Sequence, residues 1–313
     1  MKILICGLGS IGKRHAKNLM DVGEKNLIFF RERNLKLEDK ELRKIKNYNN
    51  LDAALMEKPK LTFICNTTSK HIKTAIKCAE IGSHLFIEKP LSNNFKKFEV
   101  LERLVKKNFL SVMIGYNMRF HPLMKMIKQI VINRELGNIY NVKSEWSEYL
   151  PDWHPREDYR KTYAARKEMG GGCSLTLSHE LDSLYWLFGG IKKIFNIKTY
   201  KHLDVNVDTV SDFLIYFNNN IVGYSHIDFL KKPYERNLEI SGTKKKLFFN
   251  YYKNEIKIVD RFGKIIKKKI KFEKNEMYKR EIKYLLNCIK KKIKPKPDLK
   301  DSKYILKNFL SMN

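Results

Sequence analysis

Short hydrophobic runs alternate with amphipathic stretches in the first third of the chain. The runs are bounded by turn residues and predict buried strands, whereas the stretches repeat apolar residues at helical spacing. The predicted strands comprise residues 2–6, 26–30, 61–65, 84–86 and 111–114. The predicted helices comprise residues 12–22, 51–56, 69–81 and 95–106. This alternation predicts an α/β Rossmann domain with a parallel, doubly wound sheet.

The pattern changes beyond Asn138, where strand-like runs dominate. The predicted strands comprise residues 196–200, 210–217, 221–229, 238–241 and 246–252, and the predicted helices comprise residues 179–188 and 275–288. Such runs, separated by turns, predict an α+β domain with a large, mainly antiparallel open sheet. We expect a dinucleotide-binding domain over residues 1–122 and a substrate-binding and oligomerisation domain over residues 123–313. Residues 123–133 form the crossing, and the last helix and tail are expected to pack back on the first domain.

The composition fits two packed domains and offers no membrane segment. The chain has 313 residues, of which 43% are hydrophobic, and none of its apolar runs approaches the roughly 20 residues of a membrane span. The first run breaks into glycines too early for a signal peptide, so we expect a cytoplasmic protein with no membrane partner. Its five cysteines are scattered without a CxxC pair, which predicts reduced thiols and no metal site.

The net charge of +29 raises the question of nucleic-acid binding. Most of the 63 basic residues are lysines, and lysine, isoleucine and asparagine are all abundant, as an AT-rich coding sequence favours. Lysine runs also fall near strand and helix ends, where they form solvated faces. We therefore expect no specific nucleic-acid partner.

A glycine turn follows the first predicted strand and opens the first predicted helix. Gly7, Gly9 and Gly12 stand in the spacing GxGxxG, where they permit a tight turn, close approach of a pyrophosphate and packing of helix on strand. The helix that includes Ser10 and Ile11 would direct its free N–H groups at phosphate. The turn predicts a nicotinamide-dinucleotide site.

The end of the second predicted strand bears on the choice of cofactor. An acidic residue about 20 residues past the turn grips the ribose hydroxyls of NAD, and here Glu32 stands between Arg31 and Arg33. Two arginines are suited to the 2′-phosphate of NADP, although they also fit an ordinary surface pair. The sequence thus favours NADP modestly, and Glu32 keeps NAD open.

Further motifs follow in a characteristic order. They are Ile64-Cys65-Asn66-Thr67 with His71, then Glu88-Lys89-Pro90, then Gly115-Tyr116-Asn117-Met118-Arg119-Phe120, and finally Gly170-Gly171-Gly172 ahead of His179. With the glycine turn, these motifs resemble the glucose–fructose oxidoreductase and inositol dehydrogenase family (Gfo/Idh/MocA) essentially end to end.

The resemblance implies residue roles. Lys89 would lie by the nicotinamide and the substrate hydroxyl, where its charge stabilises a developing alkoxide. His179 would move the hydroxyl proton, and Asp182, one turn on, would either orient that imidazole or cap local backbone. The resemblance also assigns to cofactor binding Asn66, Thr67, His71, Glu88, Lys89, Asn117 and Arg119.

One departure from the family pattern concerns the proton transfer. Many members carry an aspartate a few residues before the histidine, where this chain has Leu175 and Thr176. Neither side chain can act as a carboxylate base, which places more of the proton transfer on His179 and Lys89. The missing carboxylate also leaves the alternative that this chain binds the cofactor without catalysing a reaction.

Residues 145–156 mix aromatic and hydrogen-bonding side chains, a combination suited to a sugar ring. Basic residues follow, which favour an anionic sugar if they converge and are otherwise a solvent-exposed loop. The candidate substrate residues are Trp153, Arg156, Tyr163, Arg166 and Thr176. The stretch resembles that of relatives that act on bacterial surface-polysaccharide sugars.

The sequence as a whole predicts an NAD(P)-dependent dehydrogenase or reductase. Its expected substrate is a secondary hydroxyl or ketone of a sugar, sugar acid or nucleotide sugar. Reduction of a non-sugar carbonyl or imine, and a non-catalytic cofactor sensor, are the alternatives. The open sheet and the resemblance together predict a homodimer or homotetramer.

Overall fold

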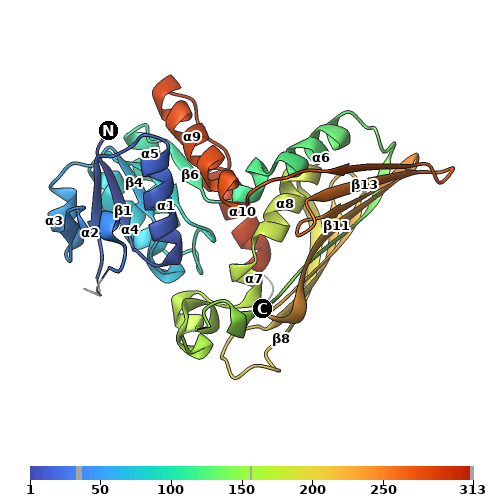
Figure 1. Ribbon diagram of the computed structural model, residues 1–313, viewed down its shortest axis with the longest axis horizontal. Coiled ribbons are helices and arrows are strands. Elements are labelled where there is room, and N and C mark those ends of the chain that lie inside the picture. Colours follow the sequence, from blue (N-terminus) through green and yellow to red (C-terminus); the bar gives the residue numbers. More distant parts are fainter. Residues whose placement is uncertain (33–36, 156, 311–313) are drawn as a thin grey trace. The chain divides into compact units, whose positions relative to one another are not determined.

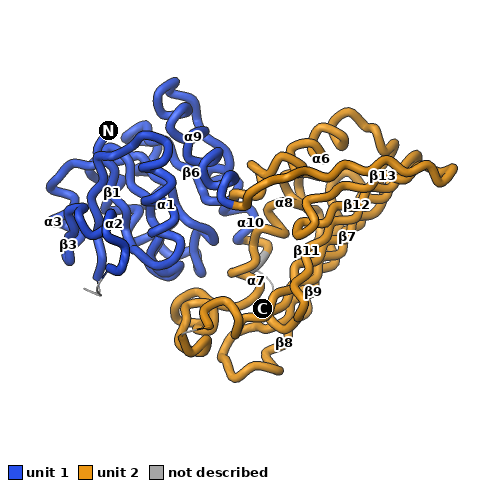
Figure 2. The backbone as a smooth tube through the Cα atoms, in the orientation of Figure 1, with its two compact units in different colours: residues 1–116, 275–306 blue, residues 117–274, 307–313 orange. Residues whose placement is uncertain are grey.

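A computed structural model of the protein describes residues 1–32, 37–155 and 157–310. The chain forms two compact units, which Figure 2 distinguishes by colour. Unit 1 comprises Met1–Tyr116 and Asn275–Leu306, and unit 2 comprises Asn117–Lys274 with the chain from Lys307. The chain thus leaves unit 1 after Tyr116, returns to it at Asn275 and leaves it again after Leu306.

Unit 1 is built on a parallel sheet. Its strands are β1 (Ile3–Cys6), β2 (Leu27–Phe30), β3 (Asn47–Tyr48), β4 (Leu61–Ile64), β5 (His84–Ile87) and β6 (Val112–Ile114). They lie in the order β3-β2-β1-β4-β5-β6, and every described pair is parallel. Each residue of β1, β2 and β4 is buried, as expected for strands covered on both faces. The predicted Rossmann sheet is confirmed.

The helices of unit 1 cover both faces of this sheet. They are α1 (Ser10–Asp21), α2 (Lys40–Arg43), α3 (Leu51–Leu55), α4 (His71–Glu80), α5 (Phe98–Lys107), α9 (Asn275–Lys291) and α10 (Leu299–Leu310), the last of which continues beyond the unit. The chain steps from β1 to β2 in one direction and from β4 to β5 in the other. Because such crossovers are right-handed, α1 and α4 lie on opposite faces (Figure 1).

The returning segment is fastened to unit 1 by hydrogen bonds. The amides of Asn18 on α1 and Asn275 on α9 exchange two bonds of 3.0 and 2.8 Å. The backbone N–H of Ile114, at the end of β6, donates to the Pro297 carbonyl at 3.0 Å. Residues 275–306 are therefore part of unit 1, although more than 150 positions separate them from its first segment.

Unit 2 is built on a larger sheet. Its strands are β7 (Ile139–Tyr149), β8 (Ile191–Thr199), β9 (Val210–Phe217), β10 (Val222–Asp228), β11 (Leu230–Gly242), β12 (Lys245–Asn250), β13 (Glu255–Asp260) and β14 (Ile265–Lys269). They lie in the order β14-β13-β12-β11-β7-β10-β9-β8. Among the described pairs β7 and β10 are parallel and the others antiparallel, which confirms the mainly antiparallel sheet.

One face of the second sheet is covered and the other is open. The helices α6 (Pro122–Ile132), α7 (Cys173–Thr176) and α8 (His179–Phe188) pack within this unit, and α6 and α8 lie along the same side of the sheet in Figure 1. Alternate residues of β9, such as Phe213 and Ile215, are fully buried, whereas Leu214 between them is 52% exposed.

Among the described residues, none of the helices combines the length and the apolar composition that a membrane span needs.

Several elements differ from the sequence prediction. The aromatic stretch from residue 145, predicted to contact substrate, begins within β7, which lies between β11 and β10 in the sheet. The predicted ranges also omit the short elements β3 and α2, the strands β13 and β14, and the helix α10. All five cysteines fall in the described residues and are buried without disulfides, as predicted.

Candidate active site

At two positions of the glycine turn, neighbouring protein atoms leave no room for a side chain, and at the third position they do. Gly7 has a φ of 94°, and a Cβ there would lie 2.7 Å from the Asn66 nitrogen. A Cβ on Gly12 would lie 2.0 Å from the Gly7 carbonyl oxygen. A Cβ on Gly9, by contrast, meets no described atom within 4 Å. The missing side chain at Gly9 therefore leaves room for something other than the chain itself.

The N-terminus of α1 offers hydrogen-bond donors at the same place. Gly9 is the N-cap and supplies no side-chain acceptor, so the first N–H groups, which include those of Ser10 and Ile11, suit an anion. Room at Gly9 and uncapped donors beside it fit the pyrophosphate of a dinucleotide.

The residues after β2 lie on the surface and are partly paired. The Arg31 Nε donates to Asn47 Oδ1 at 2.9 Å, and the Glu32 carboxylate pairs with the Lys70 ammonium. The two side chains of this pair are about half exposed. Arg33 lies outside the described residues. A cation therefore accompanies Glu32, the residue suited to ribose hydroxyls.

The loop after β4 holds Asn66 and Thr67, and His71 begins the helix behind it. Burial lowers the pKa of His71, although neighbouring carbonyls oppose this effect. Its Nδ1 lies 3.0 Å from the Pro90 carbonyl oxygen and its Nε2 lies 3.0 Å from that of Asn66. His71 thus ties the Asn66 loop to the segment after Lys89, and its direct contact with cofactor stays a prediction.

Glu88 is buried at the end of β5 and does not point to solvent. Its Oε1 accepts a 2.6 Å hydrogen bond from Nε2 of His15, and its Oε2 accepts the Lys89 N–H at 3.2 Å. Burial would raise the pKa of Glu88, but the bond and charge of His15, with the Lys89 charge, lower it overall. An ionised carboxylate thus lies directly against the Lys89 backbone. His15 was not among the residues selected from the sequence.

In unit 2, His179 is the first residue of α8, as predicted, and is 5% exposed. Its ring lies 5.7 Å from that of Trp146 on β7, between centroids. The preceding short helix α7 carries Thr176, which is buried. Asp208 anchors the start of α7 by accepting the Ser174 N–H at 2.8 Å.

The carboxylate of Asp182 has a strong partner. Arg119 Nε donates to Asp182 Oδ2 at 3.0 Å, and Arg119 Nη2 donates to Oδ1 at 2.6 Å. Both side chains are buried, so this bidentate pair joins the segment after Asn117, which is also buried, to α8. Orientation of His179 by Asp182, and cofactor binding by Asn117 and Arg119, stay predictions.

A second buried ion pair joins β11 to α8, the helix that begins with His179. Arg236 on β11 contacts Glu180 at 2.7 Å through Nε, and Ser144 donates to the same carboxylate. The Arg236 guanidinium lies 3.8 Å from the centre of the Trp146 ring. Sequence reasoning missed this group because its members come from three separate elements and form no motif.

The predicted substrate residues are placed individually. Trp153 packs edge-on against Phe229 at 5.3 Å, Tyr163 is 37% exposed, and Arg166 lies 3.9 Å from Glu168. Arg156 lies outside the described residues. The neighbouring Arg160 is paired with Asp158 and Asp204, so part of the positive charge in this region is neutralised.

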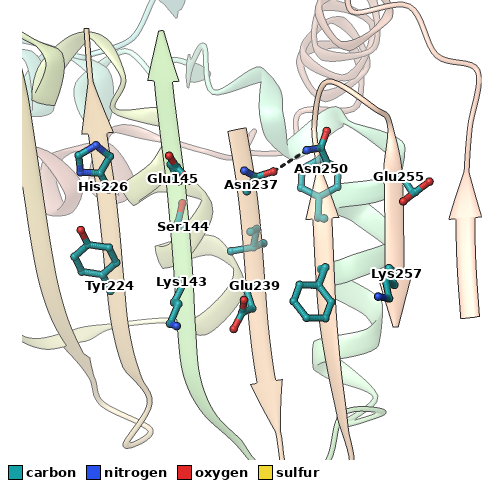
Figure 3. Close-up of a pocket in the computed structure, with 13 residues that line it drawn as sticks. Lys143, Ser144, Glu145, Tyr224, His226, Asn237, Glu239, Asn250, Glu255 and Lys257 are labelled. Atoms are coloured by element: carbon teal, nitrogen blue, oxygen red, sulfur yellow. Dashed lines mark hydrogen bonds between the residues drawn. The ribbon is translucent and has the colours of Figure 1, made fainter. Parts of the chain in front are cut away.

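A cavity of about 670 Å³ lies elsewhere, on the second sheet. Figure 3 shows its lining side chains on β10, β7, β11, β12 and β13, where His226, Glu145 and Asn237 follow one another across the strands. None of the residues that the sequence singled out for cofactor or catalysis lines it. This cavity is therefore not part of the site predicted from the sequence, and the catalytic roles of Lys89 and His179 stay predictions.

The fold and the glycine turn define a two-domain oxidoreductase with an NAD-binding Rossmann domain. A family model described as oxidoreductase family, NAD-binding Rossmann fold, matches residues 1–116, and the model of the GFO/IDH/MocA C-terminal domain matches residues 124–248. The chain belongs to the Gfo/Idh/MocA family.

Known relatives extend over most of the chain. Myo-inositol 2-dehydrogenase of Thermotoga maritima is 25% identical over 268 residues, which are 79% of this chain and 75% of that enzyme. The structure of levoglucosan dehydrogenase with NADH and levoglucosan has a TM-score of 0.88 at 16% identity and covers 99% of this chain and 95% of its own. UDP-N-acetylglucosamine 3-dehydrogenase GnnA of Acidithiobacillus ferrooxidans has a TM-score of 0.80 at 18% identity, with coverages of 99% and 96%.

Proposed function

We propose that this protein is an NAD(P)-dependent dehydrogenase or reductase acting on a secondary hydroxyl or ketone of a sugar-like ring. The observation that carries the proposal is the open space over Gly9 beside the uncapped start of α1, in a chain of an oxidoreductase family. The turn residues Gly7, Gly9 and Gly12, with the N–H groups of Ser10 and Ile11, would hold the pyrophosphate.

Two side chains divide the chemistry in this proposal. The bound nicotinamide supplies the hydride acceptor or donor. Lys89 places an ammonium at the reacting oxygen and stabilises the negative charge that develops there. His179 takes the hydroxyl proton during oxidation and returns it during reduction.

The proposed substrate is a ring with neighbouring hydroxyls. The names of three relatives point to myo-inositol, levoglucosan and UDP-N-acetylglucosamine, all of which carry secondary ring hydroxyls. Trp153, Tyr163, Arg166 and Thr176 are the described candidates for contacts with it. The pairing of Arg160 with two carboxylates weakens the argument for a strongly anionic sugar.

Cofactor preference is proposed to lean towards NADP. Arg31 follows β2 directly, and its guanidinium suits a 2′-phosphate. Lys70 pairs with Glu32 and so offsets the carboxylate that would repel that phosphate. Dissociation constants for NADPH and NADH, measured by quenching of protein fluorescence, should be lower for NADPH. Tighter binding of NADH would reverse this preference.

The central experiment combines a screen with two variants. Sugars, sugar acids and nucleotide sugars are offered with NAD and NADP, and reduction is followed by absorbance. Lys89→Ala and His179→Ala should each lower kcat by about a hundredfold or more while NAD(P)H still binds. Unchanged turnover in both variants would contradict the mechanism.

A non-catalytic cofactor sensor is the second candidate. The observation that favours it is the absence of a carboxylate at Leu175 and Thr176, both on the buried α7. A sensor would bind NAD(P)H and oxidise or reduce none of the screened sugars. One verified turnover that is lost in His179→Ala rules it out.

We also propose that the open face of the second sheet binds another copy of the chain. Phe195, Leu214 and Tyr224 lie opposite one another on β8, β9 and β10 and are 54%, 52% and 42% exposed. The same row continues to Lys143 and Glu239. Opposite charges on one face allow a two-fold related copy to pair with it.

A further inference from the structure

The segment that carries Lys89 is held by buried contacts from within unit 1. Glu88 Oε1 meets His15 on α1, and Glu88 Oε2 meets the N–H of Lys89. These contacts connect the helix that begins at the glycine turn with the lysine proposed to act on the substrate.

His15 is enclosed as firmly as a core residue. Its side chain is 0% exposed, and its ring lies 5.3 Å from Phe63, 4.9 Å from Phe86 and 5.8 Å from Tyr278. These rings come from β4, β5 and α9. A histidine in such an environment is costly unless it makes a specific hydrogen bond, and its described bond is the one to Glu88.

Glu88 is equally specified by its surroundings. Its side chain is 8% exposed, and a Cβ on Gly115 would lie 3.2 Å from its carboxyl carbon. The glycine at 115 thus makes room for this carboxylate. A buried carboxylate is stable only with donors, and His15 and the Lys89 N–H supply two.

From these contacts we infer that His15 and Glu88 are positioning residues for Lys89, and that they couple the cofactor-binding helix α1 to the placement of its ammonium. The inference rests on the role proposed for Lys89. His15 fixes one carboxylate oxygen, the other fixes the Lys89 backbone, and His71 holds the Pro90 carbonyl from the far side. Loss of the His15 donor leaves Glu88 free to turn and releases the Lys89 N–H.

The test compares His15→Phe, which keeps a ring but no donor, with His15→Gln, whose amide can donate to Glu88. We expect His15→Phe to lower kcat between about 10- and 100-fold, as misplacement of a catalytic group does, with little change in the NADH dissociation constant. His15→Gln should restore most of kcat. The matched control is Asn18→Leu, on the same helix α1 as His15. It breaks the amide pair with Asn275 on α9 and should leave kcat within about twofold.

A double variant separates positioning from general loss of structure. In a Lys89→Ala background, His15→Phe should lower kcat no further, because both changes act through one group. Additive losses, or an equal fall in Asn18→Leu, would overturn the inference. If Lys89→Ala alone leaves turnover unchanged, the proposed role of Lys89 fails instead.

Hydrogen exchange tests the contact without any substrate. The Lys89 amide should exchange about tenfold faster in His15→Phe than in the wild type, with recovery in His15→Gln. Unchanged exchange at Lys89 would overturn the inference whatever the sugar screen finds.

Discussion

His226 carries an unusual arrangement of charge on the open face of the second sheet. Its Nδ1 lies 2.8 Å from Asp212 and its Nε2 lies 2.9 Å from Asp228. The hydrogen bond with Asp228 contributes most to raising the pKa of His226 to about 9. The hydrogen bond and charge of Asp212 raise this pKa further, while burial lowers it. The imidazolium form is therefore stabilised in the folded protein.

Stability should depend on pH through this residue. A raised folded pKa gives stabilisation that is complete below the ordinary value of 6.5 and is lost as the pH rises through about 9. Tyr224, which bonds Asp212, does not titrate in this window because its pKa is raised to about 12. Urea midpoints should fall across the window in the wild type and fall less in His226→Gln. His202→Gln, at an exposed position, is the control and should keep the wild-type slope.

The Arg119–Asp182 pair makes a second residue-level prediction. Both side chains are buried, at 8% and 0% exposure, so Asp182→Asn leaves a buried guanidinium without its counter-charge. The expected cost is about 3 kcal/mol in the free energy of unfolding. Chemical denaturation measures it. A loss below about 1 kcal/mol, the scale of a surface pair, would show that this bond contributes little.

Sequence reasoning found residues that belong to local motifs and missed those that act over long separations. Gly7, Gly9 and Gly12 share one turn, whose spacing predicts a dinucleotide site. Glu88 and Lys89 stand in one short motif, and the family resemblance implies their roles. His15 meets Glu88 across 73 positions. Nothing in the spacing of the two residues shows that contact, because it depends on how α1 packs against β4 and β5.

At the scale of elements, substitutions of Gly9 and Gly12 at the start of α1 should affect cofactor binding and stability separately. Gly12→Ala places a Cβ 2.0 Å from the Gly7 carbonyl oxygen, whereas Gly9→Ala meets no described atom within 4 Å. We expect Gly12→Ala to lower the melting temperature by several degrees, as a loss of 1 kcal/mol or more does. Gly9→Ala should leave it unchanged but weaken NADH binding about tenfold or more. A Gly9→Ala protein that binds NADH like the wild type would contradict the assignment of this turn.

Element prediction succeeded where one periodicity dominated and failed where tertiary context decided. The strand β9 and the helix α8 have the predicted bounds, and the residues of β9 alternate between buried and more exposed positions. Polar residues such as Glu145 and Glu148 interrupt the apolar pattern of β7, and their partners lie on β11 and in the turn after β12. Lys231 binds Glu145, and Tyr252 binds Glu148.

At the scale of the whole molecule, the open sheet face raises the question of what covers it. A row of exposed apolar side chains is costly in water, and large exposed patches mark association sites. Phe195 and Leu214 are paired on adjacent strands near one edge of the sheet. An interface that buries one of them therefore also buries the other. The covered face, in contrast, has its apolar residues already packed within the unit.

Leu214→Glu should convert the proposed oligomer into monomers. A carboxylate in the middle of the apolar row must be desolvated without a partner, so the dimer dissociation constant should rise about a hundredfold or more. Analytical ultracentrifugation measures the change, and circular dichroism should show an unaltered fold because Leu214 is half exposed in the chain. Phe109→Glu makes the same kind of change at a 91% exposed residue of unit 1 and should leave the oligomer intact. A wild-type protein that sediments as a monomer would disprove the interface, and an oligomer that survives Leu214→Glu would place its contacts on another surface.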